Sequence, residues 1–151
     1  MNVRYDMINP DLFVKNRRDL YKLLKNNSLA IFHSNDEMLR NGDCFFPFRQ
    51  NSDLLYLCGI DQEQSILLLF PDCPNPTYRE VLIVRKTSEQ IKVWEGPKYT
   101  KQEASKISGV KTVFWLENFN GILNLLANDI QSIYVNQDDH VRAKSDVDSR
   151  D

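Results

Sequence analysis

A chain of 151 residues is long enough for one globular domain and short for two. Its hydrophobic content of 42% and its charged content of 26% are those of an ordinary globular protein. The formal net charge of −2 gives no electrostatic reason to expect a nucleic acid or an anionic membrane surface as a partner.

The cysteines and the N-terminus bear on the compartment. Cys44, Cys58 and Cys73 are odd in number and lack a C-x-x-C spacing, which favours free thiols in a reducing environment. The first residues contain no apolar stretch typical of a secretory signal. No apolar run approaches the roughly 18 residues that a membrane helix needs. We therefore expect a cytoplasmic protein without a membrane span.

The first predicted element is a helix that starts at Asn9-Pro10 and closes at Asn26-Asn27. Asn9 suits the N-cap and Pro10 the first helical position. The apolar side chains fall mostly on one face. We interpret the remaining, basic face as solvated rather than as an anion-binding surface; it contains Lys15, Arg17, Arg18, Lys22 and Lys25. The apolar run Leu29 to His33 then predicts a strand covered on both faces.

A polar loop is predicted from Ser34 to Asp43, and a stretch dense in aromatic residues follows it. Pro47 disfavours regular structure at its start. Three residues that often cap helices, Asn51, Ser52 and Asp53, then precede a leucine-rich segment. This pattern predicts a short helix that ends near Gly59.

The second half of the chain alternates between strand and helix signals. Residues 65–70 and 80–84 predict a hairpin whose proline-rich connection, 71–76, has no regular structure. Residues 87–91 predict a short helix that leads to a turn at Gly96-Pro97.

A capping box at Thr100–Glu103 predicts a helix to about Ile107, with Gly109 just past its end. A strand over 110–115, a helix over 117–127 and a strand over 132–135 complete the predicted elements. We therefore predict one α/β domain over residues 1–136: a mixed sheet of five to six strands with helices on both faces. Residues 137–151 are predicted to be a polar tail.

The central stretch carries a resemblance to a known family. Residues 46–59 read Phe-Pro-Phe-Arg-Gln-Asn-Ser-Asp-Leu-Leu-Tyr-Leu-Cys-Gly, and the apolar strand 65–70 follows. This run resembles the N-terminal domain of aminopeptidase P, the Xaa-Pro aminopeptidases with the related creatinases and prolidases. Leu54 stands where the family has an aromatic residue, and Cys58 where it has Thr. The resemblance extends from about Asn9 to Val135. We expect structural roles for the motif residues Arg49, Gln50, Asp53, Tyr56 and Gly59.

The resemblance implies a peptidase whose catalytic residues lie in a different domain from the one that this chain resembles. Enzymes of the family remove the first residue from peptides whose second residue is proline. They use two metal ions, typically manganese, in a following catalytic domain. No P-loop, G-x-G-x-x-G, G-x-S-x-G or H-E-x-x-H motif can be written over this sequence. We therefore expect a non-catalytic N-terminal domain without a metal site. Its expected partners are its own catalytic domain, the neighbouring subunits of a homo-oligomer and the peptide substrate.

Two residues are candidates for contact with a neighbouring subunit. Trp94, in Val-Trp-Glu-Gly, and Asp43 match family positions that approach the substrate cleft of an adjacent subunit. The competing interpretation makes Trp94 a rim residue that packs on its own domain and Asp43 a loop cap. For Arg49 we favour a brace that uses acceptors such as Asp53.

Two other functions remain open at this point. The domain could belong to a non-enzymatic pita-bread relative that binds protein or peptide, such as a histone chaperone. It could also belong to a prolidase or creatinase, although the Arg-Gln-Asn-Ser-Asp run fits aminopeptidase P better. The sequence that follows Asp151 in the parent gene would discriminate between them.

Overall fold

The computed structural model describes residues 8–34, 39–41, 44–45, 50–86 and 99–136. Its α-helices are α1 (Asp11–Tyr21), α2 (Ser52–Cys58), α4 (Lys101–Ser108) and α5 (Phe119–Leu126). Its strands are β1 (Ser28–His33), β2 (Leu39–Asn41), β3 (Cys44–Phe45), β4 (Ile66–Leu69), β5 (Glu80–Val84), β6 (Thr112–Trp115) and β7 (Ser132–Val135). Short 3₁₀ turns lie at Pro76–Tyr78, Leu116–Asn118 and Ala127–Asp129.

Five strands form one mixed sheet in the order β6-β5-β4-β1-β7. The central strand β4 runs antiparallel to both of its neighbours, β1 and β5. The two outer pairs, β1 with β7 and β5 with β6, are parallel. The separate pair β2–β3 is antiparallel. The predicted mixed α/β sheet is confirmed.

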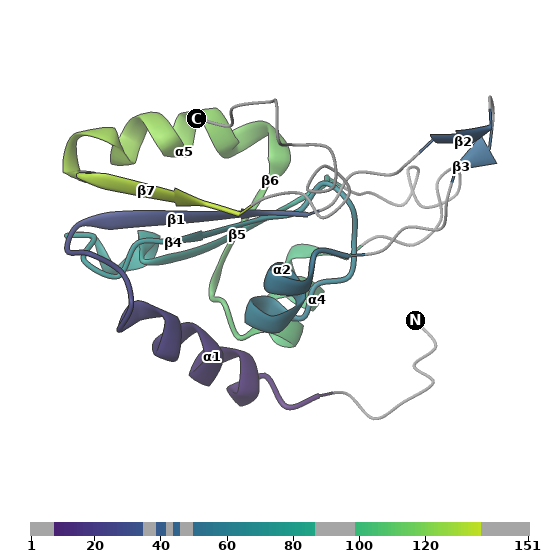
Figure 1. Cartoon of the computed structure of the whole chain (residues 1–151), viewed down its shortest axis with the longest axis horizontal. Coiled ribbons are helices and arrows are strands. Elements are labelled where there is room, and N and C mark those ends of the chain that lie inside the picture. The colour runs from purple at the N-terminus through teal and green to yellow at the C-terminus, as the bar shows by residue number, and fades with distance from the viewer. Residues whose placement is uncertain (1–7, 35–38, 42–43, 46–49, 87–98, 137–151) are drawn as a thin grey trace.

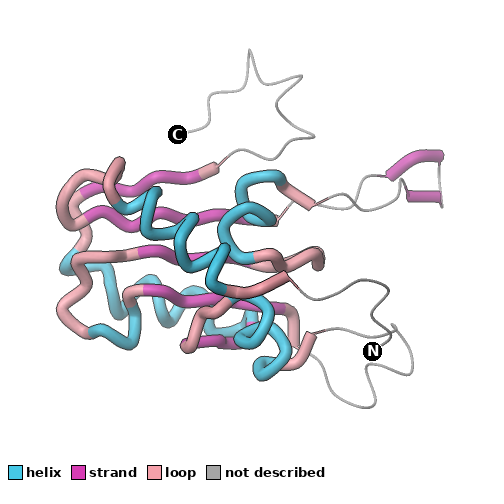
Figure 2. Tube along the Cα trace, turned by 90° about the horizontal axis from the view of Figure 1, so that it is seen from below, coloured by secondary structure: helices cyan, strands magenta, loops and turns pink. Residues whose placement is uncertain are grey.

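Helices cover both faces of the sheet, as predicted, and a core lies under each layer. In Figure 1, α5 lies above the sheet, and α1, α2 and α4 lie below it. Side chains of α2 and α4 bury one core against alternate residues of β1, β4 and β5. Ile122 and Leu126 of α5 bury the other core against the intervening residues of the same strands. Figure 2 shows the strands side by side, with the helices crossing the sheet.

The first helix is shorter than predicted. The helix begins at Asp11, with Pro10 rather than Asn9 in the N-cap position, although the Asn9 side chain accepts a hydrogen bond from the Asp11 N–H. The helix ends at Tyr21 rather than near Asn26, so Leu23 lies outside it and is 78% exposed. Asn27 adopts a left-handed conformation (φ 54°), and its N–H donates to the Asp72 carboxylate. This long-range contact fixes the turn into β1, and no local helix signal could reveal it.

The two capped helices follow their sequence signals closely. The Asn51 side chain accepts from the N–H groups of Asp53 and Leu54 at the start of α2. Both halves of the capping box between Thr100 and Glu103 form at the start of α4. Gly59 and Gly109 end these helices in the left-handed conformation, which only glycine adopts without strain.

Other predictions are corrected or lie outside the description. The loop predicted over 34–43 contains strand β2, and a 3₁₀ turn, Pro76–Tyr78, begins at the last residue of the connection 71–76 that was predicted to be irregular. The predicted helix 87–91 and the polar tail 137–151 lie outside the described residues. Among the residues that are described, none of the helices has the length and apolar character needed to cross a membrane.

Candidate interaction site at the carboxyl end of the sheet

The strand directions bring several chain ends to one edge of the sheet. Because β4 opposes both β1 and β5, these two strands run in the same direction, as do their parallel partners β7 and β6. Four strands therefore finish at the edge where β4 begins. In open α/β sheets, ligands and partners generally bind outside the carboxyl ends of the strands.

Gln50, a residue of the family-like motif, is buried at this edge. Its Nε2 donates to the carbonyl oxygens of Ile60 and Gln62, both at 2.9 Å, and its Oε1 accepts from the Asn51 N–H. Both N–H groups of its side-chain amide, and one of the two lone pairs of its oxygen, therefore form hydrogen bonds within the domain. This arrangement makes Gln50 a structural residue that joins the start of α2 to the segment leading into β4.

Of the other described motif residues, Gly59 lies at a contact between two helices, whereas Asp53 and Tyr56 lie on the surface. At Gly59 (φ 72°), an added Cβ would lie 2.4 Å from the Phe13 ring, so α1 and α2 approach closely there. Asp53 and Tyr56 project from α2 into solvent, and Tyr56 is 57% exposed. Tyr56 therefore lies on the surface, whereas Gly59 brings two helices together.

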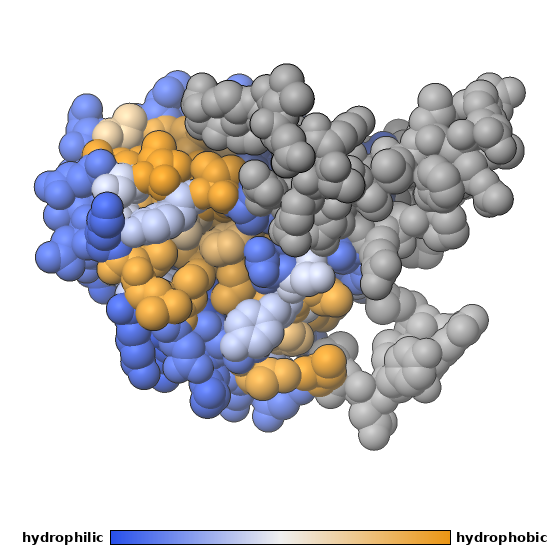
Figure 3. Space-filling view, viewed as in Figure 1, coloured by the Kyte–Doolittle hydropathy of each residue, from blue (hydrophilic) through white to orange (hydrophobic). Residues whose placement is uncertain are grey.

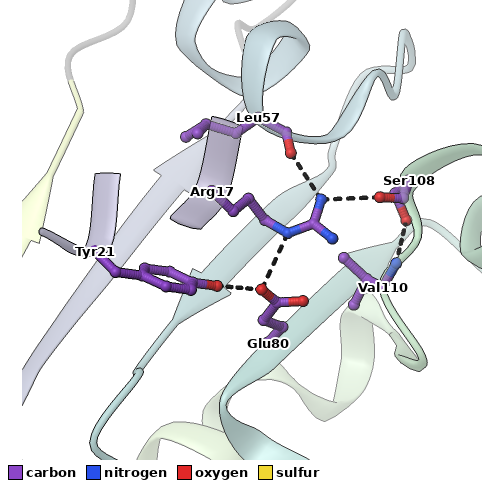
Figure 4. Close-up of polar contacts among 6 residues, drawn as sticks. All are labelled: Arg17, Tyr21, Leu57, Glu80, Ser108 and Val110. Carbon is purple, nitrogen blue, oxygen red and sulfur yellow. Dashed lines mark hydrogen bonds and ion pairs between the residues drawn. The ribbon is translucent and has the colours of Figure 1, made fainter. Parts of the chain in front are cut away.

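Arg17 is a buried residue that the sequence interpretation placed wrongly on a solvated face. Its side chain is fully buried, and its Nη1 donates to the carbonyl oxygens of Leu57 in α2 and Ser108 in α4. Figure 4 shows the guanidinium directed between these two helix ends. A cation there offsets the partial negative charge of both helix C-termini. Arg17 therefore ties three helices together.

A carboxylate and a phenol complete this cluster. The Arg17 Nε lies 3.2 Å from a Glu80 carboxylate oxygen, and the same oxygen accepts a hydrogen bond from the Tyr21 hydroxyl. Burial, reinforced by the neighbouring Glu80 carboxylate, raises the pKa of Tyr21 far above its usual value of 10.0. The hydroxyl thus stays protonated and donates to Glu80 at neutral pH. The signal available in the sequence was Arg17 lying four residues before Tyr21 on the same helix face as apolar residues.

One open surface depression, of about 440 Å³, lies beside α4 and β6. Another, of about 330 Å³, lies between α1 and α2 and is more apolar. Its lining combines apolar side chains with two carboxylates: Asn16, Asp19, Leu20, Leu23, Phe32, Asp53, Tyr56 and Leu57. Figure 3 shows apolar surface on the face that contains β7, between α5 and α1. The exposed apolar side chains of β7 are Ile133, Tyr134 and Val135.

The described residues show no site for metal or thiol chemistry. Among them, no group of three or more His, Cys, Asp or Glu side chains is arranged to hold a metal ion. Cys58 and Cys73 are buried free thiols. Burial raises the pKa of Cys58 from 9.0 to about 12, so its thiol stays protonated and unreactive at neutral pH.

Three sequence-predicted site residues lie outside the described residues. They are Asp43, Arg49 and Trp94. The structure describes the chain on both sides of the segments that carry them. The structural environments of these three side chains, and the proposed bracing of Arg49 by Asp53, therefore remain predictions.

Comparisons with known proteins agree on one domain type. The family model described as "Aminopeptidase P, N-terminal domain" matches residues 13–134. The Xaa-Pro aminopeptidase of Escherichia coli is 26% identical over 137 residues, which are 91% of this chain and 31% of that protein. The Xaa-Pro aminopeptidase of Haemophilus influenzae is 25% identical over 122 residues, 81% of this chain and 28% of its own length.

Solved structures show the same fold. Aminopeptidase P from Escherichia coli superimposes with a TM-score of 0.76 at 25% identity, over 91% of this chain and 31% of that one. An aminopeptidase from Pseudomonas aeruginosa gives a TM-score of 0.78 at 23% identity, over 94% of this chain and 32% of that one. The chain thus spans about a third of the length of these relatives.

Proposed function

This chain belongs to the aminopeptidase P N-terminal domain family, and on that premise we propose that it is the non-catalytic part of an Xaa-Pro aminopeptidase. In this role it shapes the substrate entrance and takes part in subunit association. The observation that carries the proposal is the match to the N-terminal domain alone, over residues 13–134. The remaining two thirds of the relatives' length corresponds to nothing in these 151 residues.

The geometry supports an entrance role for the carboxyl edge of the sheet. The segments that carry Asp43 and Trp94 both leave the described fold there, after β1 and after β5. That edge is where α/β domains generally meet their ligands. We propose that Trp94 is the principal contact to a neighbouring subunit of a homo-oligomer and that Asp43 assists it. Truncating such an aromatic anchor typically costs about 2–4 kcal/mol of binding free energy.

The proposal assigns the hydrolytic chemistry to a separate catalytic domain. That domain would hold the two metal ions, with manganese as the expected metal, and would cleave peptides with proline in second position. Two buried polar side chains of the described part, Arg17 and Gln50, donate hydrogen bonds to main-chain carbonyls, two of which lie at helix ends. Their role in the proposal is to hold the entrance segments in place.

The first test is a peptidase assay on the purified chain. We expect no release of the first residue from X-Pro peptides, with or without added manganese. The full-length Escherichia coli relative, assayed under the same conditions, is the positive control. Release of the first residue by the purified chain alone would overturn the proposal.

The second test grafts this domain onto an active relative. The chain replaces the corresponding N-terminal part of the Escherichia coli enzyme, and Trp94→Ala is compared with Tyr78→Ala. Tyr78 is an aromatic residue that precedes β5, at the opposite edge of the sheet, and stacks on Phe114. We expect Trp94→Ala to raise KM for peptide or to weaken subunit association, and Tyr78→Ala to alter thermal stability only. Equal effects of both variants on KM would contradict the entrance role.

A further inference from the structure

The last strand of the sheet presents an apolar edge. β7 stands at one end of the order β6-β5-β4-β1-β7, so β1 is its one neighbour among the strands that the structure describes. Ile133 and Val135 of β7 are 58% and 59% exposed. Every second residue of an edge strand also directs its N–H and C=O groups away from the sheet. The β7 edge therefore combines exposed aliphatic side chains with backbone groups that no described strand pairs.

The two exposed side chains lie at the margin of one core. In the register of β7 with β1, their partners are Leu29 and Ile31. Both partners are buried in the core under α5, so Ile133 and Val135 lie on the α5 face of the sheet. Figure 1 shows α5 over β7, and Leu125 of this helix is also exposed. The apolar surface of Figure 3 extends over this part of the molecule.

The opposite edge of the sheet carries charges that β7 lacks. Lys111 directly precedes β6, and the Lys101 Nζ lies 5.1 Å from the centre of the Trp115 ring in that strand. These two lysines and Lys106 line the hollow beside β6. Lysines at a sheet edge oppose pairing with a further strand. By contrast, residues 130–136 contain no Asp, Glu, Lys, Arg or Pro. The β6 edge is thus protected against pairing, and the β7 edge is not.

We propose that β7 is an interface between two copies of this chain, whose β7 strands pair antiparallel about a two-fold axis. Such a contact brings the same surface of both copies together, so a charge in β7 would face a like charge. The neutral segment 130–136 avoids this repulsion, and a second copy always presents the same neutral edge. The pairing joins two five-stranded sheets into one, and it buries Ile133 and Val135 of both copies on the face that the α5 helices cover.

This interface goes beyond the proposed function, whose subunit contacts are Asp43 and Trp94. The two proposals therefore fail separately. Peptidase activity of the purified chain would defeat the proposed function and leave the β7 interface intact. A purified chain that does not self-associate would defeat the interface and leave the proposed function intact.

The first experiment is sedimentation equilibrium of the purified 151-residue chain over a roughly hundredfold range of protein concentration. We expect the average mass to rise from that of one chain toward that of two, because a two-fold contact closes on itself. A chain that stays monomeric would mean that something other than a second copy covers β7, and it overturns the proposal. A mass that rises past two chains also overturns it.

A charge placed in the strand tests the surface. Ile133→Lys brings two like charges together in the interface, and we expect it to weaken self-association at least about tenfold. The matched control is Leu55→Lys, which replaces an exposed leucine on α2, a helix of the opposite face. We expect this control to associate as the parent does. Ile133→Thr keeps a β-branched residue and replaces Ile133→Lys if the latter prevents cooperative unfolding. Unchanged association of the position-133 variant, or an equal loss in the control, overturns the proposal.

A charge swap tests the two-fold pairing itself. Ile133→Lys and Ile133→Glu should each be weakened when measured alone, because each variant opposes its own charge. An equimolar mixture of the two should associate at least about tenfold more tightly than either alone, since opposite charges then meet across the axis. A mixture that associates no better than its components would show that position 133 of one copy does not meet that of the other, and the proposed pairing would be wrong.

Discussion

At the scale of single residues, two glycines differ in whether their backbone conformation and surroundings leave room for a side chain. Gly59 has a φ of 72° and lies against the Phe13 ring. A residue with a side chain would be strained by this backbone conformation and would have no space for its Cβ. Gly121 lies within α5 with nothing within 4 Å of an added Cβ. The two positions therefore form a matched pair for the same substitution.

We expect Gly59→Ala to lower the free energy of unfolding by about 1–2 kcal/mol from the left-handed backbone alone, and further because the Phe13 ring must move. Gly121→Ala should raise it by about 0.5–1 kcal/mol, because alanine favours the helix. Urea unfolding of both variants beside the parent chain measures these differences. A Gly59→Ala chain as stable as the parent would show that the close contact between α1 and α2 is wrong.

Arg17 shows, also at this scale, how a charged residue can be structural. Its two carbonyl partners lie 40 and 91 residues away in the chain. Removing one partner of a buried ion pair is generally strongly destabilising, because the other charge remains without compensation. Arg17 therefore contributes to stability by joining α1, α2 and α4, which is unrelated to the anion binding that a basic helix face would suggest.

At the scale of elements, caps decide where the short helices begin. α2 and α4 have 7 and 8 residues, and isolated helices of this length are unstable in water. Capping groups satisfy the N–H groups at their first turns, and the cores on the sheet supply the remaining stability. The Thr100 cap is the clearest case, because its side chain and that of Glu103 each accept from the other's backbone N–H.

We expect Thr100→Ala to lower the free energy of unfolding by about 1 kcal/mol, because the Glu103 N–H loses its acceptor. Thr100→Ser keeps the hydroxyl and should remain within about 0.5 kcal/mol of the parent. Thermal unfolding followed by circular dichroism compares the three chains. Equal losses for the alanine and serine variants would mean that the threonine methyl group, rather than the cap, stabilises α4.

At the scale of the whole molecule, burial links stability to pH. The Cys58 thiol is fully buried, and its pKa rises from 9.0 to about 12 in the folded chain. Above about pH 9 the unfolded chain therefore releases a proton that the folded chain retains. Stability then falls as pH rises, because the folded state binds more protons than the unfolded state. The buried Tyr21 hydroxyl, whose pKa is also raised, acts in the same direction at higher pH.

We expect the free energy of unfolding to fall by about 1.4 kcal/mol per pH unit from Cys58 alone between about pH 9 and about pH 12. Below the unfolded pKa this contribution to stability is fully present. Cys58→Ala should be less stable at neutral pH and should lose less stability as the pH rises. Urea unfolding from about pH 8 to about pH 10 separates the two slopes; parallel slopes would contradict the burial of an ionisable thiol.

The sequence by itself determined the elements whose signals lie within a few residues. The caps at Asn51 and Thr100, the closing glycines Gly59 and Gly109, and the apolar strand runs all predicted what the structure contains. The mixed sheet and the family resemblance followed from the same local patterns. These succeed because capping, left-handed turns and strand burial are set by neighbours along the chain.

Only the tertiary structure decided which distant groups meet. The burial of Arg17 and the turn into β1 at Asn27 both depend on partners far away in sequence. A helical pattern does not reveal whether a basic side chain meets solvent or two carbonyl oxygens of other helices. That choice is made when the sheet brings those helices together, because a buried charge is tolerated only where fixed acceptors surround it.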